Sequence, residues 1–266
     1  MALKNQRKYI WEDGIKVNFD FSKINEVVER CKAKATKADY KCSICRDSGF
    51  IIIAQIDAQP VIKACSCKNK ERLKIEWQDS GFNISCNDLT LGKFESERNK
   101  VSKRMKEIAI EYIDNFEGIQ FNTNSSIAFL GEPGTGKTHA CIAISLELLK
   151  KGFKPVYFPY RDCMDEMIDL RITNKSKYEN KLSKYQKCNI LFLDDVFKGG
   201  HTDAEIRLLF KIVNYRYINR LPIIVSSECL SNDLLKIDKA IGSRIIEMAK
   251  DRILDIIGEE YNQRLC

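Results

Sequence analysis

The chain has 266 residues, of which 44% are hydrophobic and 30% are charged, which is the composition of an ordinary soluble protein. This length allows one large domain, or one medium domain together with a small one. The longest apolar runs, such as residues 50–54 and 190–193, are far too short to cross a bilayer, and the amino-terminal stretch has no signal-like apolar run. We therefore expect a cytoplasmic protein that does not contact membranes.

The net charge of +7 is spread evenly along the chain. Residues 1–90 hold 16 Lys/Arg against 12 Asp/Glu, giving +4, and residues 91–266 hold 28 against 25, giving +3. A dedicated DNA-binding domain usually has a denser basic face than this. Charge alone therefore does not indicate nucleic-acid binding.

The pattern of the chain changes near its first third. Residues 1–90 contain a cysteine cluster and one amphipathic helix near residues 24–34, and turn signals mark a linker somewhere in 78–100. We expect an amino-terminal region over 1–90, with a metal-binding module at about 40–70, followed by a larger domain over 91–266. In the larger domain, helices are expected at 101–116, 138–151, 161–172, 176–187 and 203–219, and strands at 126–130, 154–160, 189–195 and 221–227. This alternation predicts an α/β fold with a mostly parallel sheet covered by helices on both faces.

Four of the eleven cysteines are clustered in CSICRDSGFIIIAQIDAQPVIKACSC, residues 42–67. Two pairs, C-x-x-C and C-x-C, flank apolar segments that read as a short hairpin, and four thiolates suit tetrahedral Zn²⁺. The alternative is four reduced cysteines in a core, and either Cys31 or Cys86 can substitute for one ligand. No histidine or carboxylate is spaced to leave an open coordination position, so the zinc would be structural. The expected ligands are Cys42, Cys45, Cys65 and Cys67.

The stretch IAFLGEPGTGKTHAC contains the pattern G-x-x-x-x-G-K-[ST] between an expected strand and an expected helix. Three glycines let successive backbone N–H groups converge on phosphates, and the helix amino terminus favours the same anion. The lysine reaches the β- and γ-phosphates of ATP, and the threonine hydroxyl can ligate Mg²⁺. The alternative is a glycine-rich turn that caps a helix, which explains neither the lysine nor its position. The expected nucleotide-binding residues are Gly131, Glu132, Pro133, Gly134, Thr135, Gly136, Lys137, Thr138 and His139.

A second pattern, ILFLDDVF, is a buried strand that ends in two adjacent carboxylates. Open α/β sheets bind ligands at the carboxyl ends of their strands. Asp194 is the expected Mg²⁺-linked acid, and Asp195 the expected general base that polarises an attacking water. A small-molecule kinase has no need of the second acid, so the pair favours hydrolysis; the alternative is that both acids merely cap a strand end.

Two further segments have polar residues with expected roles. LPIIVSSE is another buried strand, and one of Ser226, Ser227 or Glu228 should lie between the phosphate-binding loop and the acids; Ser227 is taken as catalytic. IGSRIIEM carries Arg244, which is either a surface charge or an arginine finger that reaches the γ-phosphate held by a neighbouring subunit.

Together these segments resemble the AAA+ ATPases of the DnaC/DnaI helicase-loader clade, which also includes the IstB transposition helpers. The resemblance rests on GEPGTGKTHAC, LFLDDVFKG, NYRYINRLPIIVSSE and IGSRIIEM, and covers roughly residues 125–250. Two departures stand out. Glu228 occupies a position where many relatives have asparagine, and the tail from residue 255 is too short for the helical lid of larger AAA+ proteins. Arg264 is the only late candidate for a second sensor arginine.

The resemblance implies an ATPase that loads a replicative DNA helicase onto single-stranded DNA, self-assembles through its AAA+ domain, and grips the helicase through its amino-terminal zinc module. It also implies roles for Lys137, Asp194, Asp195 and Arg244. Alternatives are an IstB-like helper of a transposase, a zinc adaptor whose nucleotide site is only a switch, and a small-molecule kinase. A phage or mobile element is the expected source.

Overall fold

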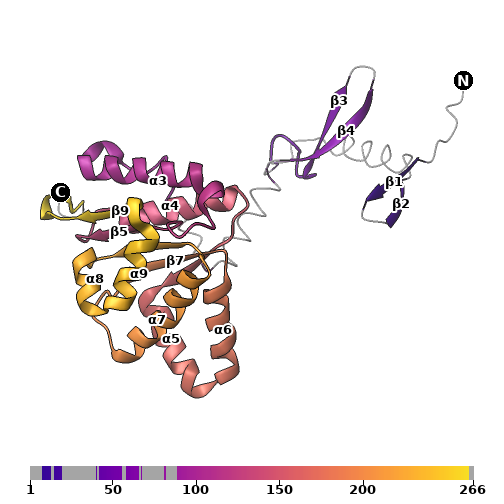
Figure 1. The fold of residues 1–266 in the computed structure, drawn as a ribbon. Helices are drawn as coiled ribbons and strands as arrows, with labels where there is room; N and C mark the ends of the chain where they lie inside the picture. Colours follow the sequence, from indigo (N-terminus) through magenta and orange to yellow (C-terminus); the bar gives the residue numbers. More distant parts are fainter. Residues whose placement is uncertain are drawn as a thin grey trace, which may run out of the picture. The chain divides into compact units, whose positions relative to one another are not determined.

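The computed structural model describes residues 8–12, 15–19, 40, 42–55, 58–65, 67, 81 and 89–263. The chain divides into two compact units, Met1–Asn69 and Lys70–Cys266 (Figure 1). Cys31, Cys86, Arg264 and the helix expected near residues 24–34 lie outside the described residues. None of the described helices is both long enough and apolar enough to cross a membrane.

The amino-terminal unit contains two antiparallel strand pairs. Strand β1 (Lys8–Glu12) pairs with β2 (Ile15–Phe19), and β3 (Phe50–Gln55) pairs with β4 (Ala58–Ala64). The second pair is the hairpin expected between the two cysteine pairs. Its ends bring residues 42–49 and 65–67 together, which matters for the metal site described below.

The second unit is built on a five-stranded parallel sheet. Its strand order is β6 (Pro155–Pro159), β7 (Ile190–Val196), β8 (Ile223–Ser227), β5 (Ile127–Gly131) and β9 (Ile253–Ile256). The predicted parallel α/β sheet is therefore confirmed. Strand β8 lies between β5 and β7, so polar groups at its end fall between the phosphate-binding loop and the acids. Strand β9 was not predicted, because it is only four residues long and mostly half-buried.

Helices cover both faces of this sheet. On one face lie α3 (Lys100–Ile119) and α4 (Lys137–Lys150). The other face carries α5 (Tyr160–Thr173), α6 (Lys175–Lys187), α7 (Asp203–Ile218), α8 (Ser231–Ile237) and α9 (Lys239–Ala249). Short 3-10 turns occupy Ser96–Arg98, Lys250–Arg252 and Glu259–Tyr261.

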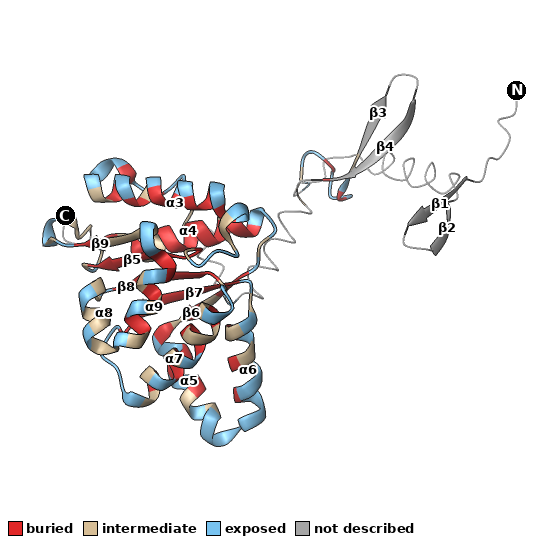
Figure 2. Cartoon of the chain, viewed as in Figure 1, coloured by how far each residue is buried: buried red, intermediate tan, exposed pale blue. Residues whose placement is uncertain are grey.

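Side chains that alternate along the strands contribute to the hydrophobic cores on the two faces of the sheet. In β5, Ile127 and Phe129 pack towards α3 and α4, whereas Ala128 and Leu130 pack towards the opposite helices. All five residues of β5 are buried, as are those of β8 (Figure 2). Because the strands are buried on both faces, their carboxyl ends form a rigid platform for the polar residues that follow them.

A fully buried arginine holds the opposite ends of β7 and β8. Arg216, on α7, donates hydrogen bonds to five backbone carbonyls, and the bond to Pro222 O, just ahead of β8, is 2.7 Å long. The other four acceptors lie just before β7: Tyr185, Gln186, Cys188 and Asn189. This guanidinium therefore ties together the starts of the two strands whose other ends carry the acids and serines.

Candidate nucleotide-binding and metal sites

The phosphate-binding loop, residues 131–138, connects β5 to α4. Gly131, Gly134 and Gly136 have positive φ angles of 105°, 71° and 88°, which L-residues with side chains rarely adopt. A Cβ at Gly131 would lie 2.1 Å from the carbonyl oxygen of Ile256 on β9, and Glu132 N–H donates to that same oxygen at 3.0 Å. The loop is therefore anchored on the unpredicted strand as well as on α4.

Lys137 lies inside this loop rather than in solvent. Its side chain is buried, and Nζ donates to the carbonyl oxygens of Gly131 at 2.7 Å and Glu132 at 2.5 Å. Burial lowers the pKa of the Lys137 ammonium, while Glu228 and Asp195 act in the opposite direction. An incoming phosphate would replace neutral carbonyl partners with charged oxygens, a stronger interaction for the same cation.

Asp194 accepts three hydrogen bonds from three different elements. Its Oδ1 accepts from Thr138 at 2.9 Å and from Ser226 at 2.5 Å, and its Oδ2 accepts from the Tyr157 hydroxyl at 2.8 Å. Burial raises the pKa of Asp194, and these hydrogen bonds oppose that rise. The structure thus brings Thr138 and Asp194 into direct contact, as two oxygen ligands of one Mg²⁺ require. Tyr157 was missed, because a tyrosine in a buried strand has no motif signal.

Asp195 points away from its neighbour because the strand bends between them. It has a positive φ of 54°, and the pairing register of β7 with β8 shifts between Leu193 and Val196. Its N–H donates to Ser226 Oγ at 2.9 Å, and its Oδ2 accepts from Lys198 Nζ at 2.7 Å. One acid therefore faces the threonine of the loop, and the other stands half-exposed beside a lysine.

Of the three polar candidates at the end of β8, Ser226 contacts both acids. The hydroxyl of Ser227, the residue predicted to be catalytic, instead donates to Val196 O at 2.6 Å. Glu228 lies 3.3 Å from Lys198 Nζ. Successive side chains of a strand point to opposite faces, so only one of two adjacent serines can reach the acids. Ser226, and not the predicted Ser227, is therefore the serine that contacts the acids.

Further polar and aromatic groups lie beside the start of α4. His139 Nε2 is 3.1 Å from Thr90 O, and its ring meets the Phe94 ring edge to face at 5.2 Å. Phe94 also lies 3.1 Å from where a Cβ of Gly136 would be. The N–H of Gln263 donates to Gly134 O at 3.0 Å. The chain ahead of α3 and the tail thus both contact the loop, which the sequence pattern did not indicate.

Arg244 lies on α9, and the structure does not bring it to the phosphate-binding loop of its own chain. Its guanidinium packs against the rings of Phe210 and Tyr217 on α7, 5.2 Å and 5.3 Å from their centroids. Its Nε donates to Asn214 Oδ1 at 3.0 Å, and a second nitrogen donates to Ala240 O at 2.8 Å. Within residues 89–263, no hydrogen bond or ion pair joins it to residues 131–138.

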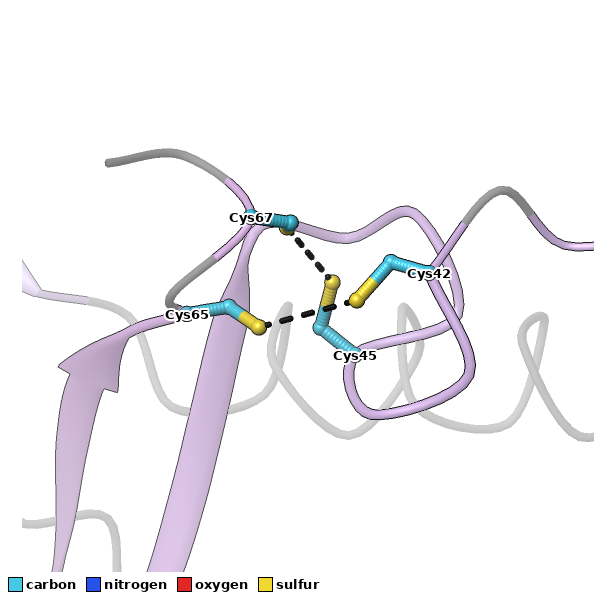
Figure 3. A group of neighbouring side chains, drawn as sticks. All are labelled: Cys42, Cys45, Cys65 and Cys67. Atoms are coloured by element: carbon cyan, nitrogen blue, oxygen red, sulfur yellow. Dashed lines mark hydrogen bonds between the residues drawn. The ribbon is translucent and has the colours of Figure 1, made fainter. Parts of the chain in front are cut away.

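The four-cysteine cluster, Cys42, Cys45, Cys65 and Cys67, comes together in the amino-terminal unit (Figure 3). All four sulfurs lie within 4.8 Å of one another, with 3.8 Å between Cys42 and Cys65 and 3.3 Å between Cys45 and Cys67. Tetrahedral zinc with Zn–S bonds of about 2.3 Å needs sulfurs about 3.8 Å apart. The cluster is already close to that spacing.

The surroundings of these thiols also fit a cation. Cys45 and Cys65 are buried, and the N–H of Gly49 donates to Cys45 Sγ at 3.3 Å, a contact that supports a thiolate. Hydrogen bonding with Cys45 and burial raise the pKa of Cys67 to about 12, so this thiol keeps its proton in the absence of a cation. A divalent metal removes that penalty by stabilising all four thiolates. The four-cysteine cluster therefore fits zinc.

Comparison with known proteins agrees with the geometry of the nucleotide-binding site. The sequence profile of the family described as IstB-like ATP binding protein matches residues 94–264. Phage-like element PBSX protein XkdC of Bacillus subtilis is 33% identical over 242 residues, covering 88% of this chain and 89% of that protein. Replicative helicase loader DnaC of Escherichia coli is 26% identical over 153 residues, 58% of each chain.

The fold also matches a solved structure. The crystal structure of the DnaC helicase loader superposes with a TM-score of 0.52 at 23% identity, over 66% of this chain and all of that one. At this identity the match supports the fold alone. ATP binding is shared by the matched family, in which ATPase activity is typical. The chain therefore belongs to the IstB-like ATP-binding family, with the α/β fold of AAA+ P-loop ATPases.

Proposed function

We propose that this protein is an ATP-dependent loader that places a replicative DNA helicase onto single-stranded DNA. The observation that carries the proposal is one assembled site at one edge of the sheet. It brings together the start of α4 and the ends of β7 and β8, through Lys137, Thr138, Asp194, Asp195 and Ser226. In AAA+ proteins, ATP is bound and hydrolysed at this edge of the sheet. The similarity to helicase loaders is the basis for proposing that ATP hydrolysis drives helicase loading.

The residues divide the chemistry among them. Backbone N–H groups of the phosphate-binding loop and the Lys137 ammonium bind the phosphates. Thr138 and Asp194 would hold Mg²⁺, which neutralises charge on the phosphoryl oxygens. Asp195 accepts a proton from the attacking water, and Ser226 fixes both acids relative to each other. Turnover then depends on Asp195, whereas binding depends on Lys137.

Arg244 completes the site in a neighbouring subunit under this proposal. Its present partners are neutral: an amide oxygen, a carbonyl oxygen and two aromatic rings. A γ-phosphate offers the same guanidinium charged oxygens, which form stronger hydrogen bonds. Assembly of several chains with ATP would thus couple hydrolysis to the ring or spiral that handles a hexameric helicase.

A local concentration of positive charge supports single-stranded DNA as a partner. Helix α6 has the sequence KSKYENKLSKYQK, with five lysines and one glutamate. Between α5 and α7 lies a cavity of about 320 Å³ whose lining includes Arg171, Arg207 and Lys211. In residues 89–263, none of these three cations forms an ion pair with a carboxylate. Phosphates along a single strand would satisfy them without reading a sequence.

A loading assay tests the proposal. Single-stranded DNA circles coated with single-strand-binding protein are mixed with the hexameric helicase of the host, ATP, and either wild-type protein or Lys137→Ala. We expect helicase to remain on the DNA after gel filtration only with the wild-type protein and ATP. Equal helicase retention with Lys137→Ala, or without any added protein, would rule out ATP-driven loading.

The matched family favours a second candidate, a helper ATPase for a transposase. The IstB-like profile covers the whole ATPase region, residues 94–264, and does not separate the two activities. The four-cysteine cluster lies outside that match, at residues 42–67, so the profile does not address the partner that this cluster would bind. Stimulation of strand transfer by a transposase from the same element, with no effect on helicase loading, would establish the second candidate.

A further inference from the structure

A lysine with no role in the scheme above lies between two carboxylates at the edge of the sheet. Lys198 Nζ is 2.7 Å from Asp195 Oδ2 and 3.3 Å from Glu228 Oε1. Asp195 lies near the end of β7, and Glu228 directly follows the neighbouring strand β8. The lysine therefore connects the expected general base to the adjacent strand end.

The backbone around Lys198 is held in place from two sides. Its own N–H donates to Asp195 O at 3.1 Å, closing a tight turn. Arg161, at the start of α5, donates to Lys198 O at 3.1 Å and to Gly200 O at 3.3 Å. Arg161 is itself paired at 2.8 Å with Glu205, a buried carboxylate on α7. Helices α5 and α7 thus fix the turn that carries the lysine.

The ion pairs of Lys198 add little stability. Lys198, Asp195 and Glu228 keep 45%, 34% and 35% of their side-chain surfaces exposed, and ion pairs of that kind contribute little to folding. The turn also contains two residues other than glycine with positive φ, Asp195 at 54° and Phe197 at 62°. Burial of the Phe197 side chain in the core holds this turn in place. The pairing of Lys198 with the two acids is therefore better explained by what it positions than by stability.

We propose that Lys198 is a positioning residue for Asp195. It binds Oδ2 of that carboxylate and leaves Oδ1, which makes no hydrogen bond within residues 89–263, to face the attacking water. Glu228 holds the ammonium from the β8 side. This inference rests on the proposed role of Asp195 in hydrolysis.

Steady-state ATPase measurements on three variants provide the test. Lys198→Met should lower turnover about tenfold, a fraction of the roughly 10²–10⁴-fold that a general base supplies, with the KM for ATP unchanged. Lys198→Arg should recover most of the turnover because it keeps the charge. Lys236→Met is the matched control: Lys236, on α8 with an exposed side chain, forms a pair of the same i,i+3 type with Asp233, at 3.0 Å. It should have wild-type turnover.

A double-mutant comparison separates positioning from a general structural effect. In single-turnover experiments, Asp195→Asn and Asp195→Asn/Lys198→Met should hydrolyse ATP equally slowly, because the lysine then has no base to position. An unchanged or raised turnover in Lys198→Met would overturn the inference. A change in the KM for ATP alone would also overturn it. The same would follow if adding Lys198→Met to Asp195→Asn lowered turnover as much as it does in the wild type. Wild-type turnover in Asp195→Asn alone would instead refute the proposed base.

Discussion

Replacing Ser226 with alanine tests which serine of β8 acts at the site. The Ser226 hydroxyl donates to Asp194 Oδ1 at 2.5 Å and accepts from Asp195 N–H at 2.9 Å. Ser226→Ala therefore removes one hydrogen bond to Asp194, the buried acid proposed to hold Mg²⁺, and one support of the strained backbone at Asp195. Both losses fall on groups that the proposed reaction uses.

The expected size of the effect follows from these contacts. A hydrogen bond to a charged group is worth about 1.5–3 kcal/mol, and about 1.4 kcal/mol corresponds to a tenfold change in rate. If the bond is fully used in the transition state, turnover should fall about 10- to 100-fold. ATP binding should change less, because Lys137 and the backbone of the phosphate-binding loop are untouched.

The adjacent serine provides the control. Ser227 is as fully buried as Ser226, but its hydroxyl donates to the neutral carbonyl of Val196. Ser227→Ala should cost about 1 kcal/mol of folding stability and leave turnover near the wild-type value. Phosphate release at saturating ATP and Mg²⁺, together with nucleotide titration, measures both quantities. If Ser227→Ala lost turnover while Ser226→Ala kept it, the reassignment would be refuted.

Three other predictions address the acid, the metal and the assembly. Burial raises the pKa of Asp194 above 3.8, so ionisation of this group opposes folding at neutral pH. In the absence of nucleotide at pH 7, Asp194→Asn should therefore have a higher free energy of unfolding than the wild type. This difference should shrink as the pH falls towards 3.8. Urea titrations that show no such difference would contradict the burial argument. Elemental analysis of freshly purified, reduced protein should give one zinc per chain, with marked loss in Cys67→Ser; a metal-free wild-type protein would contradict the zinc site. Arg244→Ala should bind ATP yet lose turnover, and mixing it with Lys137→Ala should restore part of the turnover; a mixture without rescue would make Arg244 a surface charge.

Much of the site could be predicted because its determinants are local. The glycines and the lysine of the phosphate-binding loop determine its conformation. Residues 131–138 could therefore be assigned without knowledge of the rest of the fold. The two acids could be placed at a strand end from the apolar run that precedes them. Likewise, the two cysteine pairs and the apolar segments between them predicted both the hairpin and the cluster of sulfurs.

The errors lie where side-chain direction depends on distant residues. Strand pairing decides that Ser226 rather than Ser227 reaches the acids, and the sequence pattern could not distinguish these two neighbours. Lys198 could not be recognised either, because its second partner, Glu228, is thirty positions away in the sequence. Strand β9 has no strong periodicity, yet its carbonyl at Ile256 anchors the phosphate-binding loop.

The central claim concerns the partner, and affinity capture from the native host tests it most directly. Tagged full-length protein carrying Asp195→Asn, which should bind ATP without hydrolysing it, is used as bait with ATP and Mg²⁺. Our account predicts recovery of a hexameric replicative helicase, and loss of that recovery when Cys42 and Cys45 are both replaced by serine. Recovery of a transposase in place of the helicase would contradict it.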